Sequence, residues 1–270
     1  MKKNRRSKSR KFNLGFATFV IPVALIVAIV IFKFIMGNPA NFQGNDPANA
    51  ALPGNFYGII YKGGFIVPIL MTLLLTVITF VIERFIAINK ATGTGNVADF
   101  VQIVKDDLKK NEIDGAMTEC DVQKGSVANV IKTVLLRYRT LEKDTTMAKD
   151  QKLSALQSEV EESTSLELPA LEENLVFLAV ITSLGTLMGL LGTVLGMIRA
   201  FAALANAGAP DSVALAQGIS EALVNTAFGI GTAAFALIFY NFFTTKIDKL
   251  TYSIDEAGFS LVQTYAANHA

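Results

Sequence analysis

The chain alternates between long apolar runs and charged stretches, and the apolar runs have the length of membrane-spanning helices. A helix needs about 20 mostly apolar residues to cross a hydrocarbon core. Four runs come near this length without a charge in the middle, at residues 12–36, 65–82, 175–198 and 219–243. We therefore expect an all-α integral membrane protein with three or four transmembrane helices and long helices that extend into a cytoplasmic helical domain.

The hydrophilic stretch between the second and third runs also shows helical periodicity. Apolar residues recur with helical spacing in three segments, and charges occupy the other faces. The segments contain Val97, Val101, Val104 and Leu108; then Val127, Val130, Ile131, Val134, Leu135 and Tyr138; and, from Met147 onward, Leu153, Leu156 and Val160. Pro169 is expected to kink or restart the third helix. Its acidic neighbours indicate a solvated face, with an ion exit as the alternative: Glu159, Glu161, Glu162, Glu167, Glu172 and Glu173.

Composition and charge place this pattern in a membrane. Hydrophobic residues make up 51% of the chain and the mean hydropathy is +0.43, above the values of soluble proteins. Residues 1–12 carry seven Lys and Arg and residues 89–174 carry eleven, whereas residues 37–63 carry one and residues 205–218 carry none. Because cytoplasmic segments are enriched in Lys and Arg, we expect both termini in the cytoplasm and four crossings.

These observations predict five parts. Residues 1–63 would form a basic N-terminus, an extra transmembrane segment at 12–36 and an outer loop, and residues 64–88 a transmembrane helix. Residues 89–174 would form the cytoplasmic helical domain, 175–243 a transmembrane hairpin, and 244–270 a cytoplasmic tail.

The first run could instead be a signal peptide, since it follows a basic start and precedes an Ala48-Asn49-Ala50 triplet that resembles a cleavage site. Its apolar run is longer than a typical signal core and the triplet lies far downstream, which favours a retained helix. Cleavage would leave three crossings and the same orientation for all that follows.

Small and hydroxylated residues form a stripe on each helix of the hairpin. On a helical wheel, one face of the third run carries Thr182, Thr186, Gly189, Thr193 and Gly196, and one face of the fourth carries Ala222, Thr226, Gly229, Ala233 and Ala236. The pairs Gly185/Gly189 and Gly192/Gly196 have GxxxG spacing, which lets membrane helices approach closely. Plain helix packing, with each hydroxyl bonded to its own backbone turn, is therefore one interpretation, and an ion pathway is the other.

Ionisable side chains are scarce in the last three runs, which have no carboxylate in their middles. Glu221 lies near one end of the fourth run, one turn from Asn225, and Arg199 near one end of the third can snorkel. Hydroxyls alone are a poor titrating site, so proton conduction would require a carboxylate from another subunit. One Cys120 and one His269 provide neither a disulfide nor a metal cluster. We expect no metal, no cofactor and no enzymatic activity, because no nucleophile–base pair or phosphate loop is found.

The last two runs resemble the signature region of the ExbB/TolQ/MotA proton-channel family, most closely ExbB. The resemblance covers about residues 170–250 and is carried by GLLGTV at 189–194 and EALxxTAxG at 221–229. It implies a homopentamer whose last two helices line a pore around the single-span helices of an ExbD- or TolR-like partner, which supplies a membrane carboxylate.

The resemblance also assigns roles to single residues. Thr193 and Thr226 match the pore-facing threonines of the family, and Glu221 matches its glutamate. Thr186 stands where the family often has proline and adds a hydroxyl to the pathway, which we extend to Thr182. Helix packing is assigned to the glycines at Gly185, Gly189, Gly192, Gly196 and Gly229.

The function that this resemblance implies is an inner-membrane motor subunit that uses the proton motive force, through a TonB-like protein, to energise outer-membrane transport. A TolQ-like role in envelope maintenance, a stator role in motility, and a non-conducting membrane scaffold stay open as alternatives. A solute transporter is disfavoured because the sequence shows no internal repeat. The cargo, the coupling ion and the partner's identity are left open, and no nucleic acid is expected.

Overall fold

A computed structural model describes residues 14–205 and 211–268, so the basic stretch 1–12 and His269 lie outside the described residues. In these two ranges the backbone is helical apart from turns and one isolated antiparallel bridge, between Phe42 and Ala51. Four helical stretches are long and apolar enough to cross a membrane, and they begin at Phe16, Ile66, Leu175 and Ser212. The prediction of an all-α membrane protein is confirmed.

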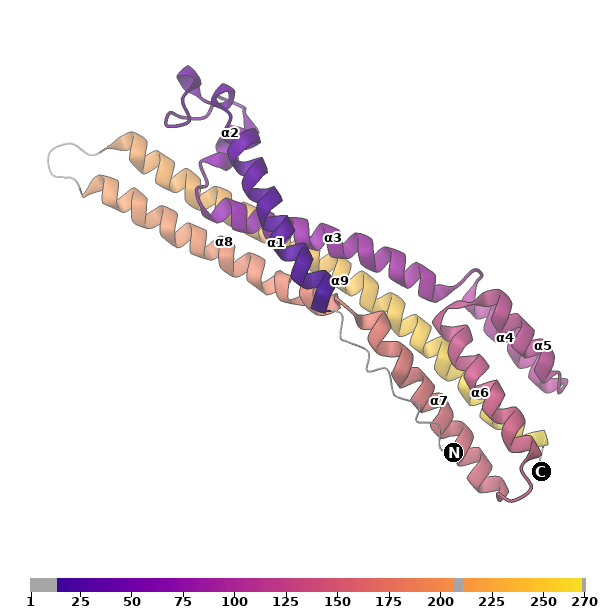
Figure 1. The fold of residues 1–270 in the computed structure, drawn as a ribbon. Coiled ribbons are helices and arrows are strands. Elements are labelled where there is room, and N and C mark those ends of the chain that lie inside the picture. The colour runs from indigo at the N-terminus through magenta and orange to yellow at the C-terminus, as the bar shows by residue number, and fades with distance from the viewer. Residues whose placement is uncertain (1–13, 206–210, 269–270) are drawn as a thin grey trace, which may run out of the picture. The chain divides into compact units, whose positions relative to one another are not determined.

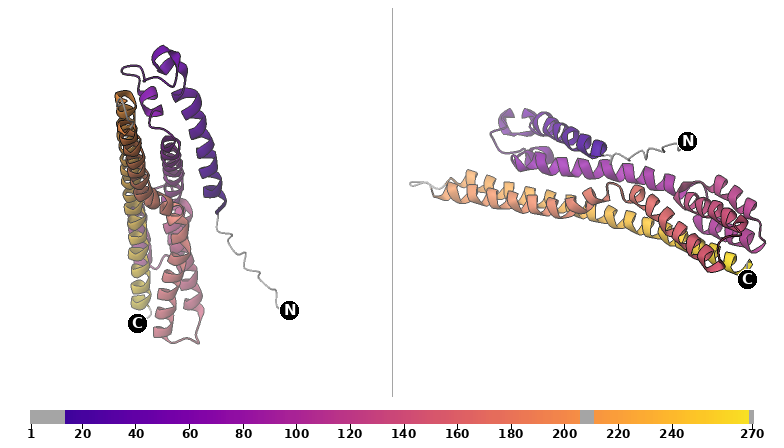
Figure 2. Two further views of the ribbon diagram at one scale, coloured as in Figure 1. Left: turned by 90° about the vertical axis from the view of Figure 1, so that its left-hand side faces the viewer. Right: turned by 60° about the horizontal axis from the view of Figure 1, so that its bottom comes forward.

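The chain divides into two compact units, of which the first comprises residues up to 81 and residues 177–238. Its elements are α1 (Leu14–Val30), the π-helix η1 (Ile31–Met36), the 3-10 turns η2 (Pro39–Asn41) and η3 (Gln43–Asn45), α2 (Phe56–Tyr61), the start of α3 (Ile66–Thr92), most of α8 (Leu175–Leu204) and the start of α9 (Ser212–Asn268). Within it, α8 and α9 run side by side (Figures 1 and 2).

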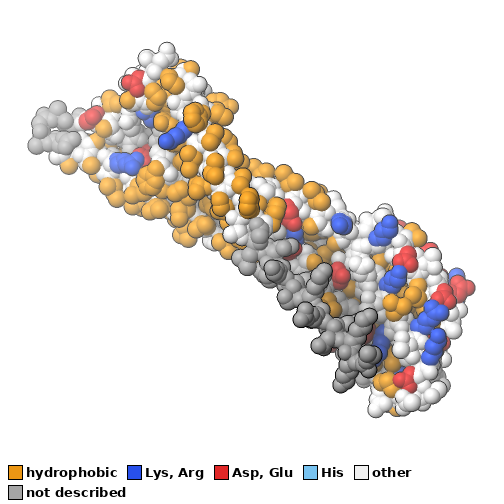
Figure 3. Space-filling model, viewed as in Figure 1, with side chains coloured by type: hydrophobic (Ala, Val, Ile, Leu, Met, Phe, Trp, Pro, Cys, Tyr) orange, Lys and Arg blue, Asp and Glu red, His pale blue; other side chains and the backbone are white. Residues whose placement is uncertain are grey.

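The core of this first unit joins its N-terminal helices to α3. Ala28, Met36, Ile60, Val67 and Met71 form a buried cluster, because α1, η1 and α2 pack against the first turns of α3. Many large apolar side chains of the same helices are exposed instead, and Figure 3 shows them gathered over this unit. An exposed apolar surface of this extent is typical of helices in contact with lipid.

The loop between η1 and α2 is held by one lysine. The Lys62 ammonium donates to the backbone oxygens of Pro47 and Ala48 at 2.8 and 3.0 Å, and it lies 5.5 Å from the ring centroid of Phe42. Burial lowers the pKa of Lys62, while the nearby Asp46 acts in the opposite direction. The loop is therefore an ordered element of the first unit.

The second unit comprises residues 82–176 and those from 239 onward. It contains the end of α3, then α4 (Val97–Lys109), α5 (Ile113–Gln123), α6 (Gly125–Lys143), α7 (Lys149–Glu172) and the end of α9. The apolar residues expected in the segment 127–138 are all buried in α6, and Leu156 is buried in α7. Lys, Arg, Asp and Glu side chains are visible over this unit in Figure 3.

Two long helices continue beyond their apolar runs, in agreement with the long helices expected, whereas the break expected at Pro169 is not found. α3 continues past residue 82 to Thr92, and α9 continues through the expected tail to Asn268, since its residues there have a buried face in the second unit. α7 passes through Pro169 without interruption, and the chain turns at Asn174, whose φ of 65° is the left-handed conformation that asparagine tolerates.

The acidic residues of α7 lie mostly at the surface. Glu161, Glu162, Glu172 and Glu173 are exposed, while Glu159 is half-buried and lies 3.8 Å from Arg137. This arrangement is that of a solvated helix face.

Candidate functional site

The two helices of the α8–α9 hairpin meet backbone to backbone. A methyl group added to Gly229 would lie 2.5 Å from the backbone oxygen of Gly185, and one added to Gly192 would lie 2.3 Å from Cβ of Asn225. Either distance is shorter than atomic contact permits, so only glycine fits these positions. The glycines of α8 that face α9 in this way are Gly185, Gly189, Gly192 and Gly196.

This close approach brings Thr193 of α8 against Thr226 of α9. Their hydroxyl oxygens are within hydrogen-bond contact of one another, and both residues are half-buried. The Thr226 hydroxyl lies 3.0 Å from the backbone oxygen of Ala222, to which it donates. The Thr193 proton can then be donated to Thr226, which gives a chain of two hydroxyls that crosses from one helix to the other.

The other two candidate threonines do not join this pair by any hydrogen bond in the described residues. The Thr182 hydroxyl donates to the backbone oxygen of Ala179 at 2.6 Å, and the Thr186 hydroxyl to that of Thr182 at 3.3 Å. Thr186 is exposed and Thr182 is half-buried. Both hydroxyls thus bond within their own helix, and Thr186 faces away from the interior of a single copy of the chain.

Glu221, the fifth candidate, is paired with Arg199. One guanidinium nitrogen of Arg199 donates to the two carboxylate oxygens at 2.5 and 2.6 Å. The Glu221 side chain is only 7% exposed, whereas that of Arg199 is 51% exposed. The arginine therefore compensates a buried charge on α9 while its own outer edge reaches the surface.

The turn before α3 covers this ion pair. Gly64 has a φ of 75°, and a methyl group there would lie 2.6 Å from Oε1 of Glu221. The neighbouring Gly63 accepts a 2.9 Å hydrogen bond from the amide of Asn225, whose side chain is completely buried. The site thus includes a glycine turn that the sequence patterns did not assign. The signals available were two adjacent glycines before an apolar run and an asparagine inside another.

None of the described residues form a group of three or more His, Cys, Asp and Glu that could hold a metal ion. The functional groups of the hairpin site are therefore hydroxyls, a buried amide and one carboxylate paired with arginine.

Comparison with known proteins shows which family this hairpin is similar to. Residues 127–256 match the MotA/TolQ/ExbB proton channel family. This range contains all the candidate residues on α8 and α9.

Individual relatives carry both ExbB and TolQ names. The chain is 41% identical over 87 residues to the biopolymer transport protein ExbB-like 3 of Synechocystis sp., a match that covers 31% of this chain and 41% of the relative. It is 37% identical over 84 residues to the Tol-Pal system protein TolQ of Haemophilus influenzae, which covers 31% and 37%. It is 41% identical over 81 residues to the biopolymer transport protein ExbB of Helicobacter pylori, which covers 30% and 56%.

The matches span between 37% and 56% of the length of these three relatives. They agree with one another and with the family match in the type of protein they indicate. Over residues 127–256, the chain is similar to the MotA/TolQ/ExbB proton channel family, and the relatives with ExbB and TolQ names support this family.

Proposed function

We propose that this chain is the channel subunit of an inner-membrane proton motor of the ExbB–ExbD type. In this proposal it assembles as a homopentamer and uses the proton motive force to energise TonB-dependent transport across the outer membrane. Protons pass along a pathway that includes Thr193 and Thr226, with Thr182, Thr186 and Glu221 along or beside it. The chain carries out no covalent chemistry.

The observation that carries the proposal is the contact between Thr193 and Thr226. Small residues let membrane helices approach closely, and here four glycines of α8 permit the approach that brings the two hydroxyls together. Two hydroxyls in series can accept and donate a proton or hold a water molecule. The same two threonines lie in the region that matches the proton channel family.

A second subunit is needed for this chemistry. α8 contains no Asp or Glu, and α9 contains none between Ala222 and Ile247. A threonine hydroxyl does not titrate near neutral pH, so a proton relay requires an acidic group nearby. An ExbD- or TolR-like partner with one membrane helix and a carboxylate would supply it. We place that helix against the hairpins of the surrounding copies, where the exposed hydroxyl of Thr186 would face it.

Our proposed topology has both termini in the cytoplasm, with residues 89–174 and 244–270 on that side. α1, the first part of α3, α8 and the first part of α9 cross the membrane. The packing of Ala28 and Met36 against Val67 and Met71 supports retention of the first segment. The lysine and arginine distribution supports the orientation.

The test is proton flux in vesicles that contain the chain together with its ExbD-like partner. Thr193→Val and Thr226→Val keep the shape of the side chain and remove the hydroxyl. We expect each to reduce flux by at least about tenfold, which corresponds to about 1.4 kcal/mol in the barrier. Thr79→Val is the matched control, because the Thr79 hydroxyl donates only within its own helix, to the backbone oxygen of Leu75 in α3.

Assembly must be measured beside flux, by the mass of the purified complex. Loss of flux with an intact complex supports the pathway. Unchanged flux in both valine variants, or equal loss in Thr79→Val, would leave the contact as helix packing in a non-conducting scaffold.

A separate experiment decides between ExbB-like and TolQ-like roles, since relatives carry both names. The chain is expressed in cells that lack both systems, and two outputs are compared: TonB-dependent uptake and outer-membrane integrity in detergent. Rescue of uptake supports the proposal, and rescue of integrity alone supports the Tol-Pal alternative.

A further inference from the structure

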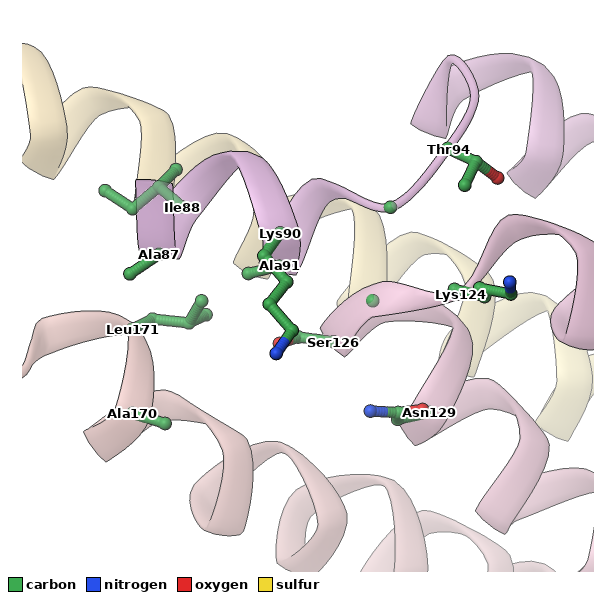
Figure 4. Close-up of a pocket in the computed structure, with 12 residues that line it drawn as sticks. Ala87, Ile88, Lys90, Ala91, Thr94, Lys124, Ser126, Asn129, Ala170 and Leu171 are labelled. Carbon is green, nitrogen blue, oxygen red and sulfur yellow. The ribbon is translucent and has the colours of Figure 1, made fainter. Parts of the chain in front are cut away.

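The second unit contains a pocket of its own, whereas the hairpin threonines belong to the first unit. The pocket has a volume of about 460 Å³ and opens between the end of α3, the turn that joins α5 to α6, and the end of α7 (Figure 4). Its floor is apolar, with Ala87 and Ile88 from α3 and Leu171 from α7. Its polar residues come from α3 and the turn after it (Lys90 and Thr94) and from the start of α6 (Lys124, Ser126 and Asn129).

The charge in this pocket is of one sign. Lys90 and Lys124 line it, and none of the twelve described lining residues is acidic. α6 begins here, and no side chain caps its N-terminus. The first-turn N–H groups of a helix have no intrahelical acceptor, and the helix dipole adds about half a positive charge. The pocket is therefore suited to an anion.

A second, independent observation concerns Ser126, a buried residue whose hydroxyl is open to the pocket. Ser126 is 6% exposed and lines the pocket, and in the described part of the chain its hydroxyl has no hydrogen-bond partner. The hydroxyl oxygen itself is not fully enclosed, so it can bond to a ligand in the pocket. In Figure 4 the Lys90 side chain extends from α3 toward the first turns of α6, where Ser126 and Asn129 lie, whereas the Lys124 ammonium points away. Lys90 and Ser126 thus line the same pocket, and we take Lys124 as a residue of its rim.

Two glycines keep this wall of the pocket in place. A methyl group on Gly125 would lie 2.3 Å from the backbone oxygen of Ala91, and one on Gly93 would lie 2.3 Å from that of Gln123. The end of α3 and the start of α6 therefore touch through their backbones, which holds Lys90 next to the open N-terminus of α6.

The position along α3 indicates where the anion comes from. A helix crosses a hydrocarbon core in about 20 residues. Counted from Ile66, α3 leaves the core shortly before Ala87, so the pocket is at the depth of the phospholipid headgroups. An apolar floor beside a cationic wall matches a phosphodiester with an acyl chain attached.

We propose that this pocket binds a phosphate group, which Lys90, the Ser126 hydroxyl and the N–H groups of the first turn of α6 hold, with Lys124 adding charge at the rim. The phosphate can belong to an anionic phospholipid or be free phosphate from the cytoplasm. This inference does not depend on proton conduction by the hairpin.

The test uses the full chain, purified and placed in nanodiscs of phosphatidylcholine alone or mixed with phosphatidylglycerol. Lipid retained after detergent exchange is counted by native mass spectrometry for the wild type, Lys90→Gln, Ser126→Ala and Lys110→Gln. Lys110 is the control, because it is exposed at the end of α4 and is not among the lining residues. We expect phosphatidylglycerol retention to fall about tenfold in Lys90→Gln and about threefold in Ser126→Ala, and to be unchanged in Lys110→Gln.

Ser126→Ala separates the pocket from general attraction to an anionic surface, since it removes no charge. Equal thermal midpoints show that a variant is folded. The second arm adds inorganic phosphate to the detergent-solubilised protein and measures binding by calorimetry. Retained lipid without phosphate binding supports the headgroup as source, and phosphate binding that both variants weaken supports free phosphate. If neither arm distinguishes Ser126→Ala and Lys90→Gln from Lys110→Gln, the proposal is overturned.

Discussion

The guanidinium of Arg199 on α8 donates to both carboxylate oxygens of Glu221 on α9, at 2.5 and 2.6 Å. The carboxylate is buried beneath the Gly63–Gly64 turn, so its negative charge is compensated by the positive charge of the arginine. This pair joins the end of α8 to the start of α9, and it lies beneath the turn that leads into α3, which is far away in the sequence. The ion pair holds the two helices of the hairpin together near the Gly63–Gly64 turn. The same hairpin carries the Thr193–Thr226 pair.

Removal of the arginine alone should therefore destabilise the protein more than removal of both charges. Arg199→Gln leaves Glu221 charged and buried, which costs about 3–5 kcal/mol, whereas Arg199→Gln combined with Glu221→Gln leaves two neutral amides. We expect a large drop in thermal midpoint for the single variant and partial recovery for the double variant. Arg139→Gln is the control, because the Arg139–Asp114 pair is largely exposed and contributes at most about 1 kcal/mol. A single variant as stable as this control would contradict the role of the pair.

The glycine contact makes a second prediction that compares two glycines of one hairpin. Gly192→Ala should cost about 1–3 kcal/mol, because its new methyl group meets Asn225, which is fully buried and cannot move aside. A methyl group on Gly231 of α9 would have nothing within 4 Å, so Gly231→Ala should be neutral or stabilise by up to about 1 kcal/mol through helix propensity. Thermal midpoints in one detergent, together with the mass of the complex, measure both. Equal effects of the two substitutions would mean that the contact does not limit packing.

Sequence patterns alone located the membrane helices, because a run of about 20 apolar residues is what a helix needs to cross the hydrocarbon core. They do not show how far each helix continues beyond its apolar run. The apolar run of α3 stops at residue 82, but the helix continues because Arg84 is buried and its guanidinium bonds to backbone oxygens of α7. α5 was not predicted, since its apolar residues show weak periodicity and Ala116 and Cys120 are what it buries.

The candidate site was predictable where it depends on spacing along one helix. Gly185 and Gly189, like Gly192 and Gly196, lie four residues apart on α8, and this spacing by itself indicates close packing. The bond from Asn225 to Gly63 joins residues separated by 162 positions, and no local pattern encodes such a pairing. The sequence did not reveal that Glu221 is the partner of Arg199. An arginine near a helix end is expected both when its side chain snorkels to the interface and when it forms an ion pair, so its position alone does not distinguish the two.

Arg84 supports a third prediction. Its guanidinium donates to the backbone oxygen of Leu171 at 3.2 Å, near the C-terminus of α7, and pairs with Glu83. Carbonyls in the last turn of a helix need such donors. Arg84→Met should cost about 1–3 kcal/mol, since it leaves those carbonyls without their donor and leaves Glu83 with the amide of Asn174 as its remaining partner. The comparison is Arg139→Met, and hydrogen exchange of the last turn of α7 should rise only in Arg84→Met. Unchanged exchange there would contradict the capping role.

Cys120 supports a prediction about reactivity and pH. It is 3% exposed in α5, and burial raises the pKa of its thiol from 9.0 to about 12. Because the thiolate is the reactive form, a shift of this size lowers its population at neutral pH by about a thousandfold. Native protein should therefore label very slowly with maleimide, and protein unfolded in denaturant should label at the rate of a free thiol. Fast labelling without denaturant would show that α5 opens readily.

The same shift determines how Cys120 affects stability. The pKa of its thiol is higher in the folded chain than in the unfolded chain, so folding favours the protonated form. That contribution is complete below about pH 9 and is lost as the pH rises toward 12, because the unfolded thiol ionises first. The thermal midpoint of the wild type should thus fall more steeply above pH 9 than that of Cys120→Ala, and the two curves should run parallel below it. Parallel curves over the whole range would mean that the thiol of the folded chain ionises as easily as that of the unfolded chain, which contradicts its burial.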